Sequence, residues 1–252
     1  MKSIIYMDNS KFLAGITMKD ETAPEANNMA LHACADPGAI AENRAFLAAS
    51  LNRSVGDFVC AQQTHSANFH RVETPDKGRG AAHLASAIPD TDALYTYESG
   101  IILSSFAADC VPLLFFNERA GVVGAVHSGW QGTVKEISLK LFQHLIEGEQ
   151  CRPEDFHIQI GPALSQEKFE VDEDVYLKFK ALGYADSFMY FNEKTGKYHI
   201  DNQLVVKRQC ELAGIPAEKI AVDRTCTFQD PSGFSYRENR KAGRHLAFIM
   251  KK

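Results

Sequence analysis

Cys110 and His127 stand at the two ends of a predicted β-hairpin. Two apolar runs, residues 111–116 and 121–126, flank residues 117–120, a polar stretch with the length of a hairpin loop. Such a loop pairs Phe116 with Gly121, and each further pair in this register has position numbers that add up to 237, as 110 and 127 do. The pattern predicts that Cys110 faces His127 with Cβ atoms about 4.5–5.5 Å apart, close enough to share a metal ion or a proton.

The same two residues also allow a purely structural interpretation. A free cysteine in a protein interior often serves only as a small apolar side chain. Pro112 lacks the N–H group of a strand residue and is compatible with a bulge that changes the register.

A second histidine follows another predicted strand. His65 lies in Gln62-Gln63-Thr64-His65-Ser66, after the apolar residues 58–60, and His127 precedes the glycine-containing turn 128–132. Strand ends that lead into a turn or a helix N-terminus expose unpaired N–H groups, so they commonly contact anions and substrates. His65, Cys110 and His127 could therefore converge, although a single histidine at a strand end is also a common structural hydrogen-bond partner.

Capping residues and apolar spacing predict four helices that would frame these strands. The first begins at Asp36-Pro37 and the second at a capping box formed by residues 133–136. Two more begin after Asp172 and Asp201 and end near Gly183 and Gly214. The expected buried faces of the first two helices consist of Ile40, Leu47 and Leu51, and of Ile137, Leu141 and Leu145.

Strands are predicted at residues 4–6, 12–16, 58–62, 101–104, 156–160 and 245–250, besides the hairpin. Because hairpins are mixed with helices, an all-parallel sheet is excluded, and we expect one α/β domain over residues 1–252 with mixed sheets. Residues 74–90 contain two prolines and two glycines without clear periodicity. They are expected to form a long surface loop, with a lid as one interpretation.

The composition favours a small substrate. The chain of 252 residues is 45% hydrophobic and 23% charged, with a net charge of -5 and a pI near 6.0. These values argue against a nucleic-acid polymer or an anionic membrane as the main partner. The first residues lack the apolar run of a secretory signal, and the six cysteines form no C-x-x-C pair. We therefore expect a cytoplasmic protein with reduced thiols.

Several ordered motifs resemble those of one known family. They comprise Gln63-Thr64-His65-Ser66, Asp92-Ala93-Leu94, Ala108-Asp109-Cys110-Val111-Pro112 and His127-Ser128-Gly129-Trp130-Gln131-Gly132. Shorter matches are Asn43-Arg44, Gly161-Pro162, Phe169-Glu170-Val171, Cys226-Thr227, Phe234-Ser235-Tyr236-Arg237 and Gly243-Arg244. Together they resemble the laccase-domain, or polyphenol-oxidase, family, which is now described as multifunctional purine nucleoside phosphorylases. The resemblance covers nearly the whole chain and is weak before residue 28.

The resemblance implies a layered fold of two mixed sheets flanked by helices, of α-β-β-α type. It implies that His65, Cys110 and His127 bind one zinc ion and act in catalysis, with copper as an alternative metal. Three protein ligands would leave one position of a tetrahedral zinc site open, as in catalytic sites. Substrate contacts are implied for Asn28, Arg44, Gln63 and Ser66. The chain departs from the family pattern at Gln131 and Glu238, where arginines are usual, so the phosphate is expected to rely on Arg44, on other basic residues or on backbone N–H groups.

The implied activity is phosphorolysis of purine nucleosides such as adenosine, inosine, guanosine and methylthioadenosine, with deamination of adenosine as a second activity. A metal-free cysteine hydrolase is the main alternative, with Cys110 as nucleophile and His127 or His65 as base, acting on an amide such as a cell-wall precursor. Copper oxidation of phenols ranks lower, because the nine histidines include no His-x-His pair. A binding module without catalysis is the third class.

Other polar residues near these motifs have structural interpretations as well. Asp92 and Asp109 could hydrogen-bond to loops or to ligand histidines instead of transferring protons. Arg237, Arg240 and Arg244 are expected to form ion pairs, with phosphate binding as the alternative. Trp130 is expected to pack against the core, although stacking on a purine is also compatible with its position.

Overall fold

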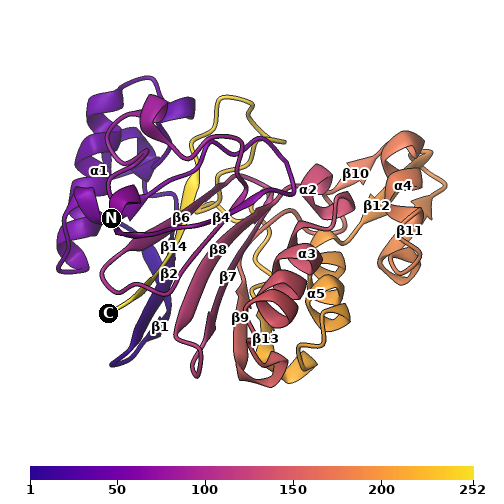
Figure 1. The fold of residues 1–252 in the computed structure, drawn as a ribbon. Helices are drawn as coiled ribbons and strands as arrows, with labels where there is room; N and C mark the ends of the chain where they lie inside the picture. Colours follow the sequence, from indigo (N-terminus) through magenta and orange to yellow (C-terminus); the bar gives the residue numbers. More distant parts are fainter.

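The computed structural model describes residues 1–252 and places two β-sheets face to face between layers of helices (Figure 1). The first sheet has five strands in the order β1 (Ser3–Asp8), β2 (Phe12–Thr17), β14 (His245–Lys251), β6 (Ile102–Ala107) and β3 (Phe58–Val59). The second has six strands in the order β13 (Ile220–Val222), β9 (Phe156–Ile160), β7 (Val111–Asn117), β8 (Val122–Ser128), β5 (Ala93–Thr96) and β4 (Phe69–Arg71). Both sheets contain parallel and antiparallel pairs, as predicted.

Successive side chains along each strand point to opposite faces of the sheet, and this explains the layering. Leu114 and Phe116 of β7 pack with Phe12 and Ile16 of β2 between the sheets, and the Phe12 and Phe116 ring centroids lie 4.8 Å apart. Phe115 lies between Leu114 and Phe116 in the sequence, so its side chain points to the opposite face of the sheet and packs against the helices. The space between the two sheets is therefore one apolar core of the molecule.

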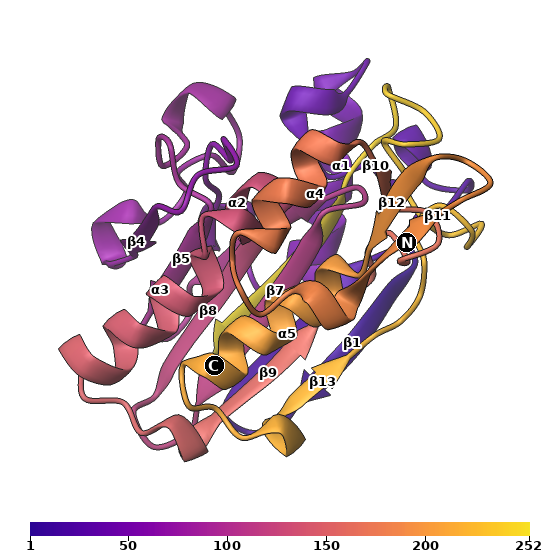
Figure 2. The same cartoon turned by 90° about the vertical axis from the view of Figure 1, so that its right-hand side faces the viewer.

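Helices cover both outer faces of the pair of sheets. Helix α1 (Pro37–Ser50) packs on the first sheet through Leu47 and Ala48. Helices α3 (Ile137–Gln143) and α5 (Asn202–Leu212) lie on the second sheet, as Figure 2 shows from the side. This arrangement confirms the expected α-β-β-α layers.

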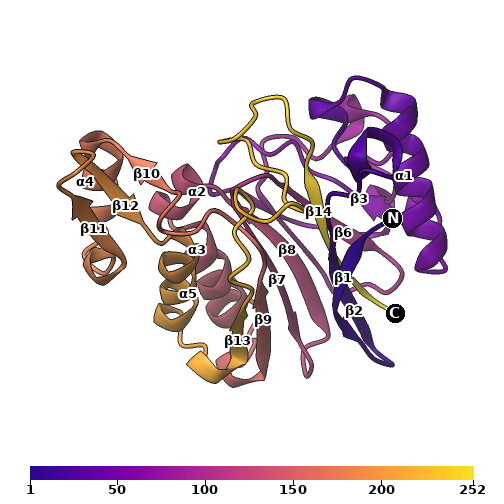
Figure 3. The ribbon, with the colours of Figure 1, turned by 180° about the vertical axis from the view of Figure 1, so that it is seen from behind.

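A small arm projects from one end of the second sheet. It consists of β10 (Glu170–Val171), α4 (Glu173–Lys180), β11 (Met189–Asn192) and β12 (Lys197–Ile200), and its three strands form a sheet of their own in the order β10-β12-β11. Phe179 and Ile200 are fully buried in a separate apolar cluster of this arm. Figures 1 and 3 show the arm extending beyond α3 and α5 from opposite sides of the molecule. None of its strands was predicted, because each has only two to four residues.

Three of the four predicted helix starts are correct. The Asp36 side chain accepts a hydrogen bond from Gly38 N at 2.8 Å at the start of α1, and the Asp201 side chain accepts one from Leu204 N at 3.1 Å at the start of α5. Asp172 immediately precedes α4 but makes no capping bond with its side chain.

The predicted capping box at residues 133–136 is wrong. A short helix, α2 (Trp130–Val134), already begins after Gly129, and Glu136 adopts a left-handed backbone with φ of 64° between α2 and α3. The two side chains that would form the box have other partners. The Thr133 hydroxyl lies 2.9 Å from that of Ser128, and the Glu136 carboxylate accepts a hydrogen bond from Tyr184.

The hairpin register is also shifted from the prediction. Pro112, not Cys110, pairs with His127, and Phe116 pairs with Val123, so paired positions add up to 239. Asn117 belongs to the strand because it pairs with Val122 of β8 and with Phe156 of β9. Its buried side chain accepts a hydrogen bond from Ala120 N at 2.9 Å, which stabilises the loop. The loop is residues 118–121, in which Gly121 adopts φ of 71°. The shift moves Cys110 to a diagonal position relative to His127, on the same side of the sheet.

Residues 74–90 cover a sheet edge and are not a lid over the candidate site. Two 3₁₀ turns, at residues 74–76 and 84–86, break the segment. Its backbone is hydrogen-bonded to β3 and the residues after it, with Gly78 N donating to Phe58 O at 2.9 Å and Gln62 N donating to Ile88 O at 2.8 Å. The segment therefore protects the short edge strand β3 from solvent.

Candidate active site

His65, Cys110 and His127 meet at one end of the second sheet. One ligand atom from each residue lies within 4.8 Å of the other two, and Cys110 Sγ lies 3.8 Å from His65 Nε2. His127 comes from the end of β8, Cys110 from the residue before β7, and His65 from the loop between β3 and β4. The sequence-predicted group is thus assembled, although not by the register that was predicted.

Asp92 holds the two histidines in place. Its buried carboxylate accepts a hydrogen bond from His127 Nδ1 at 2.8 Å and from His65 N at 3.1 Å. The other oxygen accepts bonds from Ser66 N and Ser66 Oγ, both at 2.7 Å. Because Nδ1 of His127 donates to Asp92, its Nε2 is left to face Cys110. These bonds also hold His65 in a left-handed backbone conformation, with φ of 59°.

The charges of this group shift its ionisation toward a thiolate and an imidazolium. Burial opposes ionisation of the Cys110 thiol, but the charges and hydrogen bonds of His127 and His65 outweigh it and lower the pKa of Cys110 to about 6. Burial would lower the pKa of His127, but the Cys110 charge and the Asp92 bond raise it to about 9. The Asp92 carboxyl is buried, yet the His127 and Ser66 bonds lower its pKa to about 2.

Gly129 leaves the space in which His65 and Cys110 approach each other. A Cβ atom at this position would lie 2.4 Å from His65 Cδ2 and 3.0 Å from Cys110 Sγ. The Gly129 φ of -64° is accessible to every residue. The glycine is therefore required for close approach and not for backbone conformation.

The three residues open into a cavity of about 660 Å³. One wall comes from the arm and the segment before it, and contributes Leu164, Phe169, Val171 and Val175. Polar side chains in the lining are His32, Gln63, Asp109, Asp172, Asp174, Asn202, Arg237 and Arg244, and further aromatic ones are Phe106, Trp130 and Tyr236. The cavity therefore combines one apolar wall with many polar side chains.

Asp109 fastens the loop that covers one side of the cavity. It has a left-handed backbone, with φ of 82°, and its carboxylate accepts hydrogen bonds from Thr227 Oγ1 at 2.8 Å and from Arg237 N at 2.6 Å. Asp92 and Asp109 thus both hydrogen-bond to loops, as the structural interpretation expected.

The predicted phosphate contact Arg44 is enclosed in the interior. Its side chain is only 2% exposed, and it donates hydrogen bonds to the carbonyl oxygens of Met29, Gly80 and Ala81 at 2.6–2.9 Å. The guanidinium also lies over the Phe106 ring, 5.1 Å from its centroid. Four of its five N–H groups are therefore used within the protein, which leaves one for a phosphate.

The other predicted substrate contacts also make structural hydrogen bonds. Asn28 is buried and accepts bonds from Ala30 N and Arg244 N, while its amide donates to Ala33 O. Ser66 binds Asp92 and does not line the cavity. Gln63 does line it, although its amide is paired with both backbone groups of Phe106.

The three arginines of residues 237–244 do not form the expected ion pairs. Arg237 donates to the carbonyl oxygens of Lys168 and Glu170, at 3.1–3.3 Å. No acidic side chain pairs with Arg240 or Arg244. Trp130 is half-buried, packs against the arm cluster, and has the Lys178 ammonium 5.1 Å from its ring. Nothing in the sequence pointed to His32 or Asn202 as lining residues, because neither lies in a recognisable motif.

The donor set of the group fits a metal ion. It combines two imidazole nitrogens with a thiol whose pKa is lowered, and a buried carboxylate orients one of the imidazoles, which is the usual support of a metal-bound histidine. Nitrogen and sulfur ligands of this kind suit zinc or copper and not magnesium or calcium. No other group of three or more His, Cys, Asp or Glu side chains is positioned to hold a metal ion.

Comparison with known proteins identifies the class. Residues 17–252 match the family described as multi-copper polyphenol oxidoreductase laccase, and the chain belongs to that family. It is 32% identical over 248 residues to the purine nucleoside phosphorylase YlmD of Bacillus subtilis, with 96% of this chain and 89% of that protein covered. The Geobacillus stearothermophilus protein of the same name is 35% identical over 244 residues, which cover 94% of this chain and 89% of that protein.

Solved structures show the same fold. The structure of YlmD from Geobacillus stearothermophilus superimposes with a TM-score of 0.89 at 32% identity and covers 99% of both chains. The hypothetical protein YfiH from Bacillus licheniformis gives a TM-score of 0.91 at 30% identity, with 98% of this chain and 99% of that chain covered. In this chain, no helix combines the length and the apolar character needed to cross a membrane.

Proposed function

We propose that this protein is a zinc-dependent purine nucleoside phosphorylase that acts on adenosine, inosine, guanosine and methylthioadenosine, with deamination of adenosine as a second activity. The observation that carries the proposal is the His65, Cys110 and His127 group in the lining of a cavity that can hold a nucleoside. The relatives named purine nucleoside phosphorylase support the same reaction class.

Phosphorolysis makes defined demands on such a cavity. An oxygen of phosphate forms a bond to C1′ of the ribose while the bond from C1′ to N9 of the purine breaks, and its electron pair leaves with the base, which takes up a proton. The apolar wall that includes Phe169 and Val171 would hold the purine ring. Asp172, Asp174 and Asn202 supply oxygen atoms that could accept hydrogen bonds from ribose hydroxyl groups.

His65, Cys110 and His127 would hold the metal ion, while Asp92 keeps His127 in the required tautomer. When bound, zinc supplies Lewis-acid chemistry and lowers the pKa of water, which deamination requires. The cavity takes side chains from residue 32 through residue 244, so we also propose that residues 1–252 act as one functional unit.

The direct test is a product analysis with zinc-loaded protein of measured metal content. Inosine should yield hypoxanthine and ribose 1-phosphate only when phosphate is present, and Cys110→Ala should lose both zinc and turnover. Cys151→Ala, a buried cysteine at a distance from the group, is the matched control and should retain both. Absence of nucleoside cleavage by zinc-loaded protein with phosphate would refute the assignment.

One geometric observation keeps a second function under consideration. In that function Cys110 would be the nucleophile, His127 the base and Asp92 the orienting carboxylate, which the lowered pKa of Cys110 and the contact of His127 with Asp92 support. That activity would survive a chelator and would be lost on alkylation of Cys110. The proposed phosphorylase would instead lose activity with the chelator and recover it with added zinc.

A further inference from the structure

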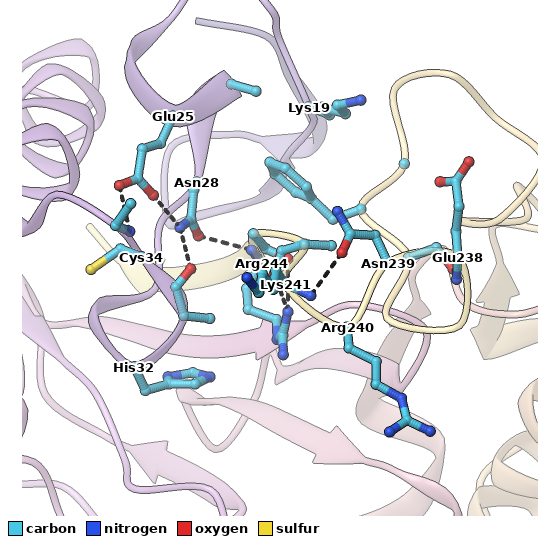
Figure 4. Close-up of a pocket in the computed structure, with 18 of the residues that line it drawn as sticks. Lys19, Glu25, Asn28, His32, Cys34, Glu238, Asn239, Arg240, Lys241 and Arg244 are labelled. Carbon is cyan, nitrogen blue, oxygen red and sulfur yellow. Dashed lines mark hydrogen bonds between the residues drawn. The ribbon is translucent and has the colours of Figure 1, made fainter.

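A second cavity adjoins the candidate active site. It has a volume of about 720 Å³ and is lined by residues 19–35 on one side and residues 233–244 on the other (Figure 4). His32 and Arg244 line both cavities and therefore stand at their boundary. We refer to this second space as the basic cavity.

The charged side chains that line the basic cavity have a small positive excess. Lys19 and Glu21 neutralise each other in an ion pair of 2.7 Å. Glu25 accepts hydrogen bonds from the backbone N–H groups of Ala35 and Asp36 and from the Asn28 amide, so its oxygens are occupied. Glu25 keeps its negative charge, so the remaining charged side chains are Arg240, Lys241 and Arg244 against Glu25 and Glu238, an excess of one positive charge (three minus two).

Arg244 presents an unused hydrogen-bonding edge at the boundary. Its Nη1 donates to the carbonyl oxygens of Ala242 and Gly243, whereas Nε and Nη2 have no partner in the protein. These two nitrogens form the edge that binds a carboxylate or phosphate through two parallel hydrogen bonds. Arg44 and Arg237 differ from it because carbonyl oxygens already occupy their Nη2 groups.

The position of Arg244 is fixed from several sides. Its backbone N donates to Asn28 Oδ1 at 2.8 Å, and its carbonyl accepts from Met29 N at 3.2 Å. The guanidinium lies 5.6 Å from the centre of the Tyr236 ring, and the side chain is half-buried. A fixed, partly desolvated guanidinium binds an oxyanion more strongly than a mobile surface arginine does.

His32 adds a second unpartnered polar group at the same boundary. Its ring packs edge-on against Phe106 at 6.1 Å and makes no hydrogen bond within the protein. A neutral imidazole can donate one hydrogen bond to an oxyanion that Arg244 holds. Both groups also face the cavity that contains Cys110 and His127.

We propose that Arg244, through its Nε and Nη2 edge, binds the inorganic phosphate co-substrate at the boundary of the two cavities, assisted by His32. Arg240 and Lys241 raise the local phosphate concentration along the basic cavity, which is the route by which phosphate reaches a nucleoside in the adjacent cavity. This assignment rests on the proposed phosphorylase function, and it replaces the role expected for Arg44.

The first experiment measures initial rates of inosine phosphorolysis by the zinc-loaded full-length protein. Arg244→Gln should raise the KM for phosphate about 10- to 100-fold, because it removes a charge-assisted hydrogen-bonded contact. The zinc content and the KM for inosine should change less than about twofold. Arg244→Lys keeps the charge but not the planar edge, so its KM for phosphate should lie between those of the wild type and Arg244→Gln. Arg119→Gln, which removes the same charge at the tip of the distant hairpin, should behave as wild type. An unchanged KM for phosphate in Arg244→Gln would overturn the proposal.

Isothermal titration with inorganic phosphate separates this proposal from the phosphorylase assignment. Phosphate should bind the wild-type protein and not folded Arg244→Gln, whatever the catalytic activity. If the wild type cleaves no nucleoside but this difference is found, the function is wrong and the anion site stands. If neither protein binds phosphate, the anion site is refuted.

Two further measurements test whether Arg244 recognises another phosphoryl group and whether the variant folds. If Arg244→Gln raises the KM for inosine 5′-monophosphate but not that for phosphate, the arginine recognises a substrate phosphoryl group and the proposal is overturned. If Arg244→Gln does not fold, as judged by circular dichroism, the double variant Arg240→Gln/Lys241→Gln at exposed positions replaces it. That variant should lower kcat/KM for phosphate and weaken its dependence on salt, and wild-type behaviour in both would refute the entry route.

Discussion

Asp92 Oδ1 lies 2.8 Å from His127 Nδ1, and the Asp92 side chain is completely buried. This contact fixes which nitrogen of His127 faces Cys110. The same carboxylate also binds the backbone of His65 and Ser66, so one residue orients two members of the candidate metal group.

Replacing Asp92 with asparagine should therefore weaken zinc binding without removing a ligand. We expect Asp92→Asn to lower the zinc affinity about 10- to 100-fold, the usual effect of losing a carboxylate partner of a ligand histidine. Competition with a chromophoric chelator measures this. The matched control is Asp90→Asn, because Asp90 binds Thr64 and Asn68 but neither histidine, and asparagine tolerates its φ of 42°. Equal affinities in the two variants would show that the Asp92 charge does not matter.

Gly129→Ala should disturb the same group by steric contact alone. The added methyl would lie 2.4 Å from His65 Cδ2, so His65 or the turn must move. We expect zinc affinity to fall by about tenfold or more, as when the orientation of a ligand is lost, while circular dichroism stays unchanged. Gly56→Ala is the control, because its nearest contact would be an ordinary 3.6 Å. Normal zinc binding by Gly129→Ala would contradict the close approach seen in the structure.

Alkylation of the metal-free protein should select Cys110 by its pKa. The thiolate reacts, and because the pKa of Cys110 is lowered to about 6, the rate should rise between about pH 5 and pH 7 and level off above. Cys34 is half-buried as well, but burial and nearby carboxylates raise its pKa, so it should stay unmodified at pH 6.5. Peptide mass spectrometry after iodoacetamide treatment distinguishes the two. Bound zinc should protect Cys110, and faster labelling of Cys34 would reverse the prediction.

Arg44→Met should reduce stability and leave phosphate use unchanged in the folded fraction. The substitution keeps the length of the side chain but leaves the buried carbonyls of Met29, Gly80 and Ala81 without donors. At about 1–3 kcal/mol for each such group, we expect a loss of at least about 3 kcal/mol in the free energy of unfolding. Urea denaturation measures it, with Arg208→Met on the exposed face of α5 as control. A stable Arg44→Met with a raised KM for phosphate would restore the original expectation for this residue.

His245 should make the protein less stable in mild acid. Its Nδ1 donates to Thr17 O at 2.8 Å and its Nε2 accepts from Phe234 N at 2.7 Å, so the neutral ring is fully satisfied. Burial lowers the pKa of His245 to about 4, below that of an unfolded histidine, so only the unfolded chain gains a proton as the pH falls from 7 to 5. This linkage removes about 2 kcal/mol of stability over that range.

Urea denaturation of wild type and His245→Gln at pH 7 and pH 5 isolates this contribution. The variant should be less stable at pH 7 but should lose about 2 kcal/mol less than wild type on acidification. Because all carboxylates and His32 are common to both proteins, their effects cancel in the comparison. Identical losses would show that His245 is not held neutral.

The mixed α/β class could be predicted because it depends on local patterns, whereas the layering of two sheets was implied by the family resemblance. The apolar run 111–116 and the capping residues Asp36 and Asp201 are local signals, and the structure confirms the strand and both caps. The short strands of the arm and β13 were missed, since two to four residues carry no reliable period and their pairing depends on partners distant in sequence.

The sequence by itself determined which three side chains could bind a metal ion, because His65, Cys110 and His127 lie in long ordered motifs. Only the tertiary structure decided how they meet, since the register of the hairpin depends on the buried side chain of Asn117 and on the left-handed Gly121. The tertiary structure also decided which arginine keeps unoccupied hydrogen-bond donors. Arg44 and Arg244 look alike in sequence, but burial against carbonyl oxygens occupies the donors of one, whereas the other keeps an open edge at the cavity boundary. The hydrogen-bond donors that a side chain keeps available depend on the groups that the folded chain packs around it. Its neighbours in the sequence do not determine these groups.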